Sequence, residues 1–172
     1  IDDAAVCEAL AAEKDMDGIT RGSLAAIYSG RGEGYAPCTA QSCIEILKYF
    51  GIPVAGKRAV VIGRSLVIGK PVSMLLLNEN ATVTTCHSRS ENLPQICREA
   101  DIIIAAAGKA AMVTKEYVKP GQTVLDVGIH VDDEGNMCGD TAFAEIEPIV
   151  DAITPVPGGV GSVTTAILAS HV

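Results

Sequence analysis

The stretch that decides the fold is Lys57-Arg-Ala-Val-Val-Ile-Gly-Arg-Ser-Leu-Val-Ile-Gly-Lys-Pro-Val-Ser-Met-Leu-Leu-Leu77. Its apolar, β-branched run at residues 59–62 is typical of a buried parallel strand. The chain then turns on Gly63 and becomes helical near Gly69, where Pro71 suits the first helical turn. A strand that leads through glycines to a helix N-terminus presents backbone N–H groups to an anion. The stretch therefore predicts a phosphate-binding turn.

The spacing of Gly63, Ser65 and Gly69 matches neither of two common phosphate-binding motifs. The dinucleotide fingerprint G-x-G-x-x-G has glycines in its first, third and sixth places, and a Walker loop needs Gly-Lys-Ser/Thr after its first glycine. On this stretch alone, an ordinary β–α turn therefore remains an alternative.

The composition is that of an acidic domain with an aliphatic core. Of 172 residues, 48% are apolar, with no Trp, two Phe and four Tyr, which suits a parallel α/β sheet. The net charge of −8, without a basic stripe, argues against nucleic acid as a partner. No apolar run approaches the roughly 18–20 residues of a membrane span, and no signal peptide opens the chain. We therefore expect no membrane partner.

The cysteines are scattered, with no C-x-x-C pair and no histidine at zinc-finger spacing. We expect free thiols in a reducing cytoplasm, with neither a metal site nor disulfides. Cys38 follows Pro37 in a loop, where a reactive thiol and a structural thiol are both open. The six are Cys7, Cys38, Cys43, Cys86, Cys97 and Cys138.

Helices and strands are expected to alternate along the chain. Asp2 or Asp3 can cap a first helix, and Thr39 a later one. The glycine-rich residues 18–36 are expected to form a loop region, and residues 132–135 a small hairpin or turn. The expected strands cover residues 59–62, 81–86, 101–108, 123–129 and 152–156, and the expected helices residues 1–13, 40–50, 69–77, 92–100 and 162–170.

This alternation predicts an α/β fold, a doubly wound, mostly parallel and Rossmann-like sheet. Right-handed crossovers place the carboxyl ends of all strands at one edge, where such sheets bind their ligands. The loops expected at that edge cover residues 63–69, 87–90, 107–110, 128–131 and 155–161.

The end of the second strand indicates which nucleotide is bound. In NAD-binding folds an Asp or Glu there binds the ribose 2′-OH, whereas Arg accommodates the 2′-phosphate of NADP. Here the strand ends in His87-Ser-Arg-Ser90, with no carboxylate before Glu91, and Arg64 adds a second cation. Ser88 and Arg89 therefore predict NADP rather than NAD. The alternative is that Arg89 is a solvated surface residue.

A series of motifs along nearly the whole chain resembles the methylenetetrahydrofolate dehydrogenase/cyclohydrolase family. The order of the motifs is more specific than any one of them. They are Lys14-Asp-Met-Asp-Gly18, Pro37-Cys-Thr39, Val61-Ile-Gly-Arg-Ser65, Gly69-Lys-Pro71, Asn80-Ala-Thr-Val-Thr84, Cys86-His-Ser-Arg89, Asp126-Val-Gly-Ile129, Gly139-Asp140 and Ile153-Thr-Pro-Val-Pro-Gly-Gly-Val-Gly161.

The resemblance implies a two-lobed cytosolic enzyme of one-carbon metabolism, in the form of a homodimer. One activity oxidises 5,10-methylenetetrahydrofolate to 5,10-methenyltetrahydrofolate with NADP, and the other hydrolyses that product to 10-formyltetrahydrofolate. The folate substrate is the partner that the resemblance implies.

The resemblance also implies roles for particular residues. Asp17 matches the acidic residue that holds the pterin, and Pro157, Gly158 and Gly159 border the folate cleft. Gly63, Arg64 and Ser65 hold the phosphates, Ser88 reaches the 2′-phosphate, and Ile129 and Thr164 lie by the nicotinamide. The turn and strand-end arguments above add Gly69 and Arg89 to this cofactor set.

Some positions depart from the family pattern. Where the family has Pro after Pro-Cys-Thr, this chain has Ala40, and where Gly is usual it has Ser42. The family's Gly-Pro-Met-Thr is here Gly161-Ser-Val-Thr164, and residues 19–36 match poorly. These departures bear on the pterin contacts more than on the cofactor site.

The family's catalytic lysine lies in a Tyr-x-x-x-Lys motif of an N-terminal lobe, and no such motif occurs here. We therefore expect residues 1–36 to be a remnant of that lobe, residues 37–172 to be the NADP-binding domain, and the chain to be cut at both ends. Such a chain is expected to bind NADP but to be inactive alone. Two alternatives stay open: another two-lobed NADP-dependent dehydrogenase, against which Pro155-Val-Pro-Gly-Gly159 argues, and a non-catalytic NADP-binding module.

Overall fold

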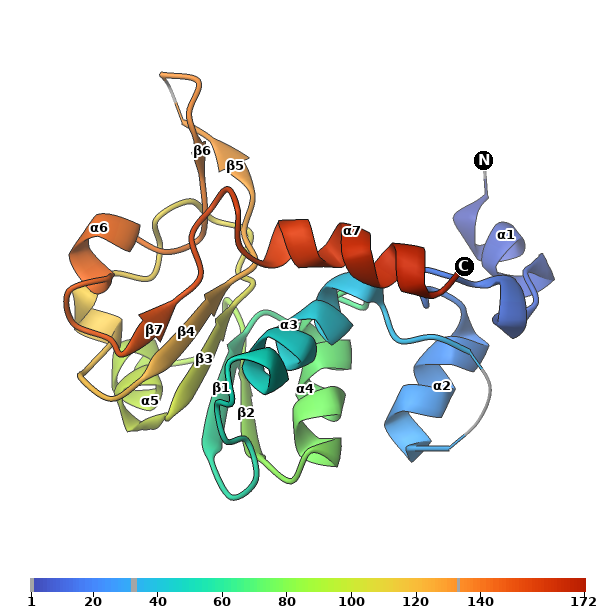
Figure 1. Cartoon of the computed structure of the whole chain (residues 1–172), viewed down its shortest axis with the longest axis horizontal. Helices are drawn as coiled ribbons and strands as arrows, with labels where there is room; N and C mark the ends of the chain where they lie inside the picture. Colours follow the sequence, from blue (N-terminus) through green and yellow to red (C-terminus); the bar gives the residue numbers. More distant parts are fainter. Residues whose placement is uncertain (1, 32–33, 133) are drawn as a thin grey trace.

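The structure is a computed structural model that describes residues 2–31, 34–132 and 134–172. A five-stranded parallel sheet in the order β2-β1-β3-β4-β7 lies at one end of the molecule, and the N-terminal helices lie at the other (Figure 1). The sheet strands are β1 (Arg58–Ile62), β2 (Thr82–Cys86), β3 (Ile102–Ala105), β4 (Thr123–Asp126) and β7 (Ala152–Ile153). The strands β5 (His130–Val131) and β6 (Met137–Cys138) form a separate hairpin.

From β1 onward helices alternate with most of the sheet strands, as the predicted α/β fold requires, and further helices precede β1 and follow β7. In chain order they are α1 (Asp3–Ala9), α2 (Arg21–Ser29), α3 (Cys38–Tyr49), α4 (Gly69–Asn78), α5 (Leu93–Glu99), α6 (Phe143–Ile146) and α7 (Val160–Ser170), with 3-10 turns η1 (Ala12–Lys14) and η2 (Lys115–Tyr117). Among the described residues, no helix has both the length and the apolar character needed to cross a membrane.

The topology confirms the predicted doubly wound sheet. β1 pairs with β2 on one side and with β3 on the other, so that Ile62 lies opposite both Cys86 and Ala105. The chain therefore winds outward from β1 in two directions, and the strand order reverses between β1 and β3. Ligands of such sheets bind outside the carboxyl ends of the strands at this switch point.

The central strands β1, β3 and β4 are buried on both faces, which explains their apolar runs, whereas the edge strand β2 is largely exposed. Val61 and Ile104 face α3, α4 and the start of α7. Val60 and Ile103 face the opposite side, where α5 and α6 pack. Figure 1 shows the same layers, with α7 extending beyond the sheet towards α1 and α2.

Several expectations about local structure were wrong, including the ends of β3 and β7, which lie at Ala105 and Ile153 rather than at residues 108 and 156. The region expected to be a loop contains α2, capped by Thr20, whose side chain accepts a hydrogen bond from Ser23 N, and ended by Gly30 at a φ of 65°. α3 begins at Cys38, so Thr39 lies inside the helix and does not cap it. β4 ends at Asp126 rather than at residue 129, and α6 had not been expected. The first helix begins as expected, since Ala5 N donates to Asp2 Oδ1.

Candidate cofactor-binding site

In the turn between β1 and α4, backbone segments pack so closely that Gly63 and Gly69 could not carry a side chain. Gly63 has a φ of 138°, and a Cβ added there would lie 2.1 Å from the carbonyl oxygen of Ala106. A Cβ on Gly69 would lie 2.3 Å from the carbonyl oxygen of Gly63. The two glycines therefore let the first turn of α4 pack directly against the turn, and the turn against the end of β3.

Ser65 fixes the start of α4 from within the same turn. Its Oγ accepts hydrogen bonds from the backbone N–H groups of Ile68 (3.1 Å) and Gly69 (3.4 Å). Ser65 is itself exposed, and the N-terminus of the ten-residue helix carries a partial positive charge. We call Gly63 and Gly69 the glycine cradle. This cradle, the Ser65 hydroxyl and the N-terminus of α4 together fit a phosphate group.

A hollow of about 370 Å³ opens beside this turn, at the switch point of the sheet. It brings together Gly63, Arg64, Ser65 and Ser88, as predicted. The charged residues of its lining are the cations Arg64 and Lys109, with no carboxylate, so it suits an anionic ligand. The complete lining is Ile62, Gly63, Arg64, Ser65, His87, Ser88, Leu93, Ala106, Ala107, Lys109 and Met112.

The loop after β2 is a tight turn around His87. His87 N donates to Ser90 Oγ (2.9 Å), and the ring Nδ1 of His87 accepts a hydrogen bond from Arg89 N (3.2 Å). Arg89 is exposed and does not line the hollow, so its predicted contact with the 2′-phosphate stays a prediction.

A second hollow, of about 340 Å³, lies at the same edge of the sheet, between the ends of β4 and β7. Ile129 lies in its lining together with Pro157, Gly158 and Gly159, and their implied contacts with the nicotinamide and the folate stay predictions. Thr164 does not line it. The Thr164 hydroxyl donates to Val160 O (3.0 Å) and accepts from Ser42 Oγ of α3 (3.3 Å), while Thr165 faces the hollow.

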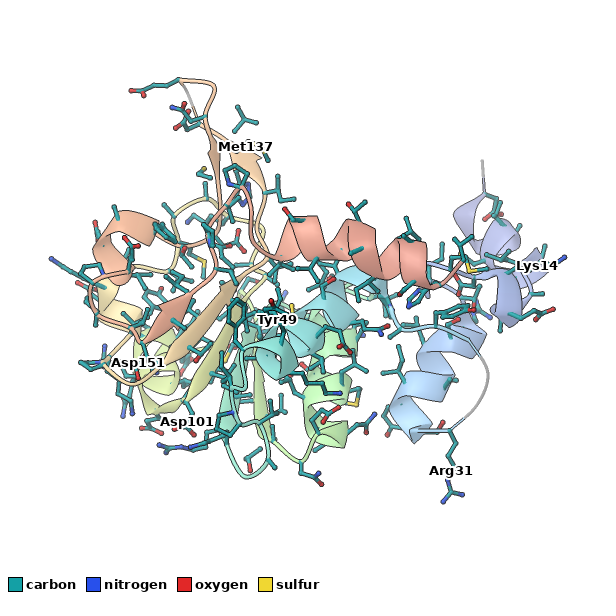
Figure 2. All side chains as sticks on the ribbon, viewed as in Figure 1. Lys14, Arg31, Tyr49, Asp101, Met137 and Asp151 are labelled. Carbon is teal, nitrogen blue, oxygen red and sulfur yellow. The ribbon has the colours of Figure 1, made fainter. Side chains whose placement is uncertain are left out.

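A larger hollow, of about 510 Å³, lies between α3 and β7 on another side of residues 158 and 159. Tyr49, labelled in Figure 2, is one of two exposed aromatic residues in its lining, and the other is Phe50. The lining is mostly apolar, its charged residue is Glu45, and it contains no cation. It therefore does not suit a nucleotide phosphate.

Two aspartates of the turn before α2 have opposite surroundings. Asp15 is buried, and its carboxylate accepts hydrogen bonds from Ile19 N (3.0 Å), Thr20 N (2.7 Å) and Ser23 Oγ (2.7 Å). Burial alone would raise the pKa of Asp15, but the hydrogen bonds from Ser23, Thr20 and Ile19 outweigh it and hold the pKa below its usual value. Asp17, the predicted pterin contact, is exposed and lines neither hollow at the sheet edge.

Cys38 lies between Asp17 and α7. Cys38 is 1% exposed, its Sγ donates to Met16 O (3.3 Å), and burial together with the nearby Asp17 carboxylate raises the pKa of the thiol to about 11. Because the thiolate is the reactive form, these surroundings favour the structural reading of Cys38.

The end of α7 connects this N-terminal segment to the sheet domain. His171 Nδ1 lies 2.7 Å from Met16 O, and His171 Nε2 lies 3.1 Å from Gln41 Oε1 on α3. The ring stacks on Tyr35 with a centroid distance of 4.3 Å. The residue that precedes Asp17 is therefore bound to the far end of α7.

Among the described residues, no group of His, Cys, Asp and Glu could hold a metal ion, and all six cysteines are free. Lys109, His87 and Met112 were not predicted as site residues, although the loop after β3 had been placed at the correct edge. A doubly wound sheet with a glycine cradle, a helix N-terminus and cations at its switch point defines a nucleotide-binding α/β domain.

Comparison with known proteins specifies the family. Residues 37–172 match the model of the tetrahydrofolate dehydrogenase/cyclohydrolase NAD(P)-binding domain, and the chain belongs to this family. The bifunctional protein FolD of Carboxydothermus hydrogenoformans is 60% identical over 161 residues, which are 92% of this chain and 56% of that protein. The chain thus spans little more than half the length of this relative.

Solved structures show the same similarity. The FolD methylenetetrahydrofolate dehydrogenase/cyclohydrolase of Campylobacter jejuni is 38% identical with a TM-score of 0.95, over 98% of this chain and 60% of that one. The FolD enzyme of Trypanosoma brucei, solved in complex with NADP cofactor and an inhibitor, is 37% identical with a TM-score of 0.91, over 99% of this chain and 61% of that one. The predicted family and the predicted fold are therefore confirmed.

Proposed function

We propose that this chain binds NADP in the hollow beside Gly63 and is the cofactor-binding part of a methylenetetrahydrofolate dehydrogenase/cyclohydrolase. The observation that supports it best is the glycine cradle, where Gly63 and Gly69 leave room for backbone alone next to the start of α4. The NADP-bound relative from Trypanosoma brucei adds support.

In this proposal the chain's own residues bind and orient the two reactants. The turn at Gly63 and Ser65 binds the phosphates, and Arg64 and Ser88 bind the 2′-phosphate. Ile129 lies by the nicotinamide, residues 157–159 form one wall for the folate, and Asp17 binds the pterin. NADP, when bound, accepts a hydride from 5,10-methylenetetrahydrofolate and so yields 5,10-methenyltetrahydrofolate, which water converts to 10-formyltetrahydrofolate.

Calorimetric titration with NADP and NAD tests the choice of cofactor. We expect NADP to bind more tightly, because the lining of the hollow contains cations and a hydroxyl but no carboxylate. Ser88→Asp should weaken NADP binding by removing a donor and adding a like charge. Thr82→Asp places the same charge at the other end of β2, and we expect it to leave NADP affinity nearly unchanged. Equal affinity for the two cofactors, or a preference for NAD, would contradict the proposal.

A second experiment tests where the catalytic groups lie. We propose that the catalytic lysine lies outside residues 1–172, so this chain should bind NADP yet show no cyclohydrolase and little or no dehydrogenase activity. The assay is NADPH absorbance with 5,10-methylenetetrahydrofolate, run on this chain and on a full-length FolD enzyme. Comparable turnover by the two would show that the catalytic groups lie within these residues.

We further propose that the full-length protein is a cytoplasmic homodimer that binds neither nucleic acid nor membrane. The free thiols support the compartment, the negative net charge argues against nucleic acid, and the homodimer rests on the family resemblance. Sedimentation of the full-length protein tests the dimer, and fractionation of cells tests the compartment.

A further inference from the structure

Two buried carboxylates hold together the loops that follow β3, β4 and β6. Asp126 accepts hydrogen bonds from Gly128 N (3.0 Å), Asp140 N (2.9 Å), Thr141 N (2.8 Å) and Thr141 Oγ1 (2.6 Å). A Cβ on Gly139 would lie 2.1 Å from Asp126 Oδ2, so the carboxylate packs directly against backbone. Asp126 therefore fixes the loop after β6 to the end of β4.

Asp140 makes the second connection and is fully buried. Its carboxylate accepts hydrogen bonds from Gly108 N (3.0 Å) and Lys109 N (3.0 Å) of the loop after β3. The ring Nε2 of His130 lies 2.7 Å from Asp140 Oδ1. The two ion pairs of Arg21 with Glu8 and of Lys48 with Glu79 join exposed side chains, whereas the carboxylate in contact with His130 is buried.

His130 lies at the base of the β5–β6 hairpin, which projects from the domain in Figure 1 and carries Met137, labelled in Figure 2. Ile129 precedes it and lines the second hollow, whereas Lys109 lines the first. The bond between His130 and Asp140 therefore connects the walls of the two hollows.

We infer that His130 is a positioning residue for the nicotinamide half of NADP, acting through Asp140 on the loop that carries Ile129. The inference rests on the proposed function, because it requires NADP to extend from the first hollow to the second. Asp140 keeps its bonds to Gly108 and Lys109 without His130, so the first hollow stays intact. Without His130, only the loop that carries Ile129, in the wall of the second hollow, loses a contact that holds it in place.

His130→Leu should therefore weaken NADP but not adenosine 2′,5′-bisphosphate, which carries the adenosine half and its phosphates without a nicotinamide. We expect a loss of about tenfold for NADP, the factor that corresponds to about 1.4 kcal/mol, and a change below about twofold for the bisphosphate. His130→Gln, whose amide N–H can reach the same carboxylate oxygen, should restore most of the NADP affinity. Val131→Ala, an exposed neighbour on the same strand, is the matched control and should change neither affinity.

The results that would overturn the inference are equal weakening of both ligands, no weakening of NADP, or no rescue by glutamine. A wild-type chain that binds neither ligand would instead overturn the proposed function. Because His130→Leu can also fail to fold, the wild-type protein supplies an independent readout. The ¹⁵N resonances of the His130 ring should shift when NADP is added and stay in place with the bisphosphate, and unchanged resonances with NADP would overturn the inference.

Discussion

The glycine cradle at the end of β1 is held by backbone contacts, whereas the junction between the end of α7 and the N-terminal segment is held by side chains. In the cradle, Gly63 and Gly69 permit close contacts between backbone atoms, and the Ser65 hydroxyl adds a hydrogen bond from a side chain. At the junction, the contacts come from the side chains of His171, Gln41 and Tyr35. Only glycine fits the close backbone contacts of the cradle, whereas the side chains of the junction can be replaced by others that make similar contacts. Substitutions should therefore be severe in the cradle and milder at the junction.

The largest effect is expected for Gly63→Ala. The new Cβ would clash with the carbonyl oxygen of Ala106, and the φ of 138° is unfavourable for alanine. We expect NADP affinity to fall by about a hundredfold or more, since the phosphates rely on this turn. Calorimetry measures the affinity and urea unfolding the stability.

Gly121→Ala is the control that separates the two causes. Gly121 also has a positive φ, of 85°, but no atom lies within 4 Å of its added Cβ. Its substitution should lower the free energy of unfolding by about 1 kcal/mol and leave NADP affinity unchanged. Normal NADP binding by Gly63→Ala would show that the cradle is more adaptable than the junction.

Asp15→Ala should have the next largest effect, on stability rather than on the cofactor. It leaves three donors, Ile19 N, Thr20 N and Ser23 Oγ, without their buried acceptor. We expect a loss of about 3 kcal/mol in the free energy of unfolding, measured with urea. Asp17→Asn at the exposed neighbouring aspartate should change stability by less than about 0.5 kcal/mol.

The same carboxylate predicts a dependence of stability on pH. The pKa of folded Asp15 lies below the usual value of 3.8, so its contribution is fully present above that value. As the pH falls through the lowered folded-state pKa, this stability is lost. Urea unfolding across the acid range should show a shallower loss for Asp15→Asn than for the wild type, and parallel curves would contradict this assignment.

His171→Leu should have a moderate effect that is confined to the junction. It removes the contacts with Met16 O and Gln41 Oε1 and the stacking on Tyr35. We expect a loss of about 1–2 kcal/mol in stability and faster proteolysis of residues 2–31, with NADP affinity unchanged. Glutamine or asparagine at this position should retain part of the stability. A parallel loss of NADP affinity would show that the two regions are coupled.

The smallest effect concerns the thiols, whose modification should distinguish buried from accessible sites. In denaturant without reductant, a thiol reagent should find close to six free cysteines, and a native disulfide would contradict this. In the folded protein, the half-buried Cys7 and Cys138 should react first. Burial raises the pKa of both Cys43 and Cys97 to about 12, so these thiols should stay protected.

The central strands of the sheet were predictable because they are buried on both faces and appear as apolar runs bounded by glycines, whereas β2 was predictable from its alternating, β-branched residues. α2 was missed because five glycines at residues 18–34 obscured its pattern. Its signals were present, since Thr20 lies at the N-cap and Leu24 and Ile27 share a helical spacing. A capping residue followed by such a spacing should have outweighed the glycines.

The residues of the cofactor site were predictable where strand order determines their position, and less so where the direction of a side chain does. Gly63, Ser65 and Ser88 lie together because strand order places their loops at one edge. Lys109 and Met112 were missed because their side-chain directions depend on how the loop after β3 packs. Thr164 and Thr165 differ by one position on α7, and only the packing of that helix against α3 shows which of them faces the hollow.

The contact between Met16 and His171 spans 155 positions of the chain and so constrains the order of folding. A loop of this length closes late, because its entropy must be lost before the contact contributes. Asn78 Nδ2 at the end of α4 donates to Ile27 O of α2 (3.1 Å), so α2 can dock on α4 before His171 is in place, whereas the contact at Met16 O needs the end of α7. The domain of β1–β4 can fold in the meantime, so the segment around Met16 is among the last parts of this chain to reach its place.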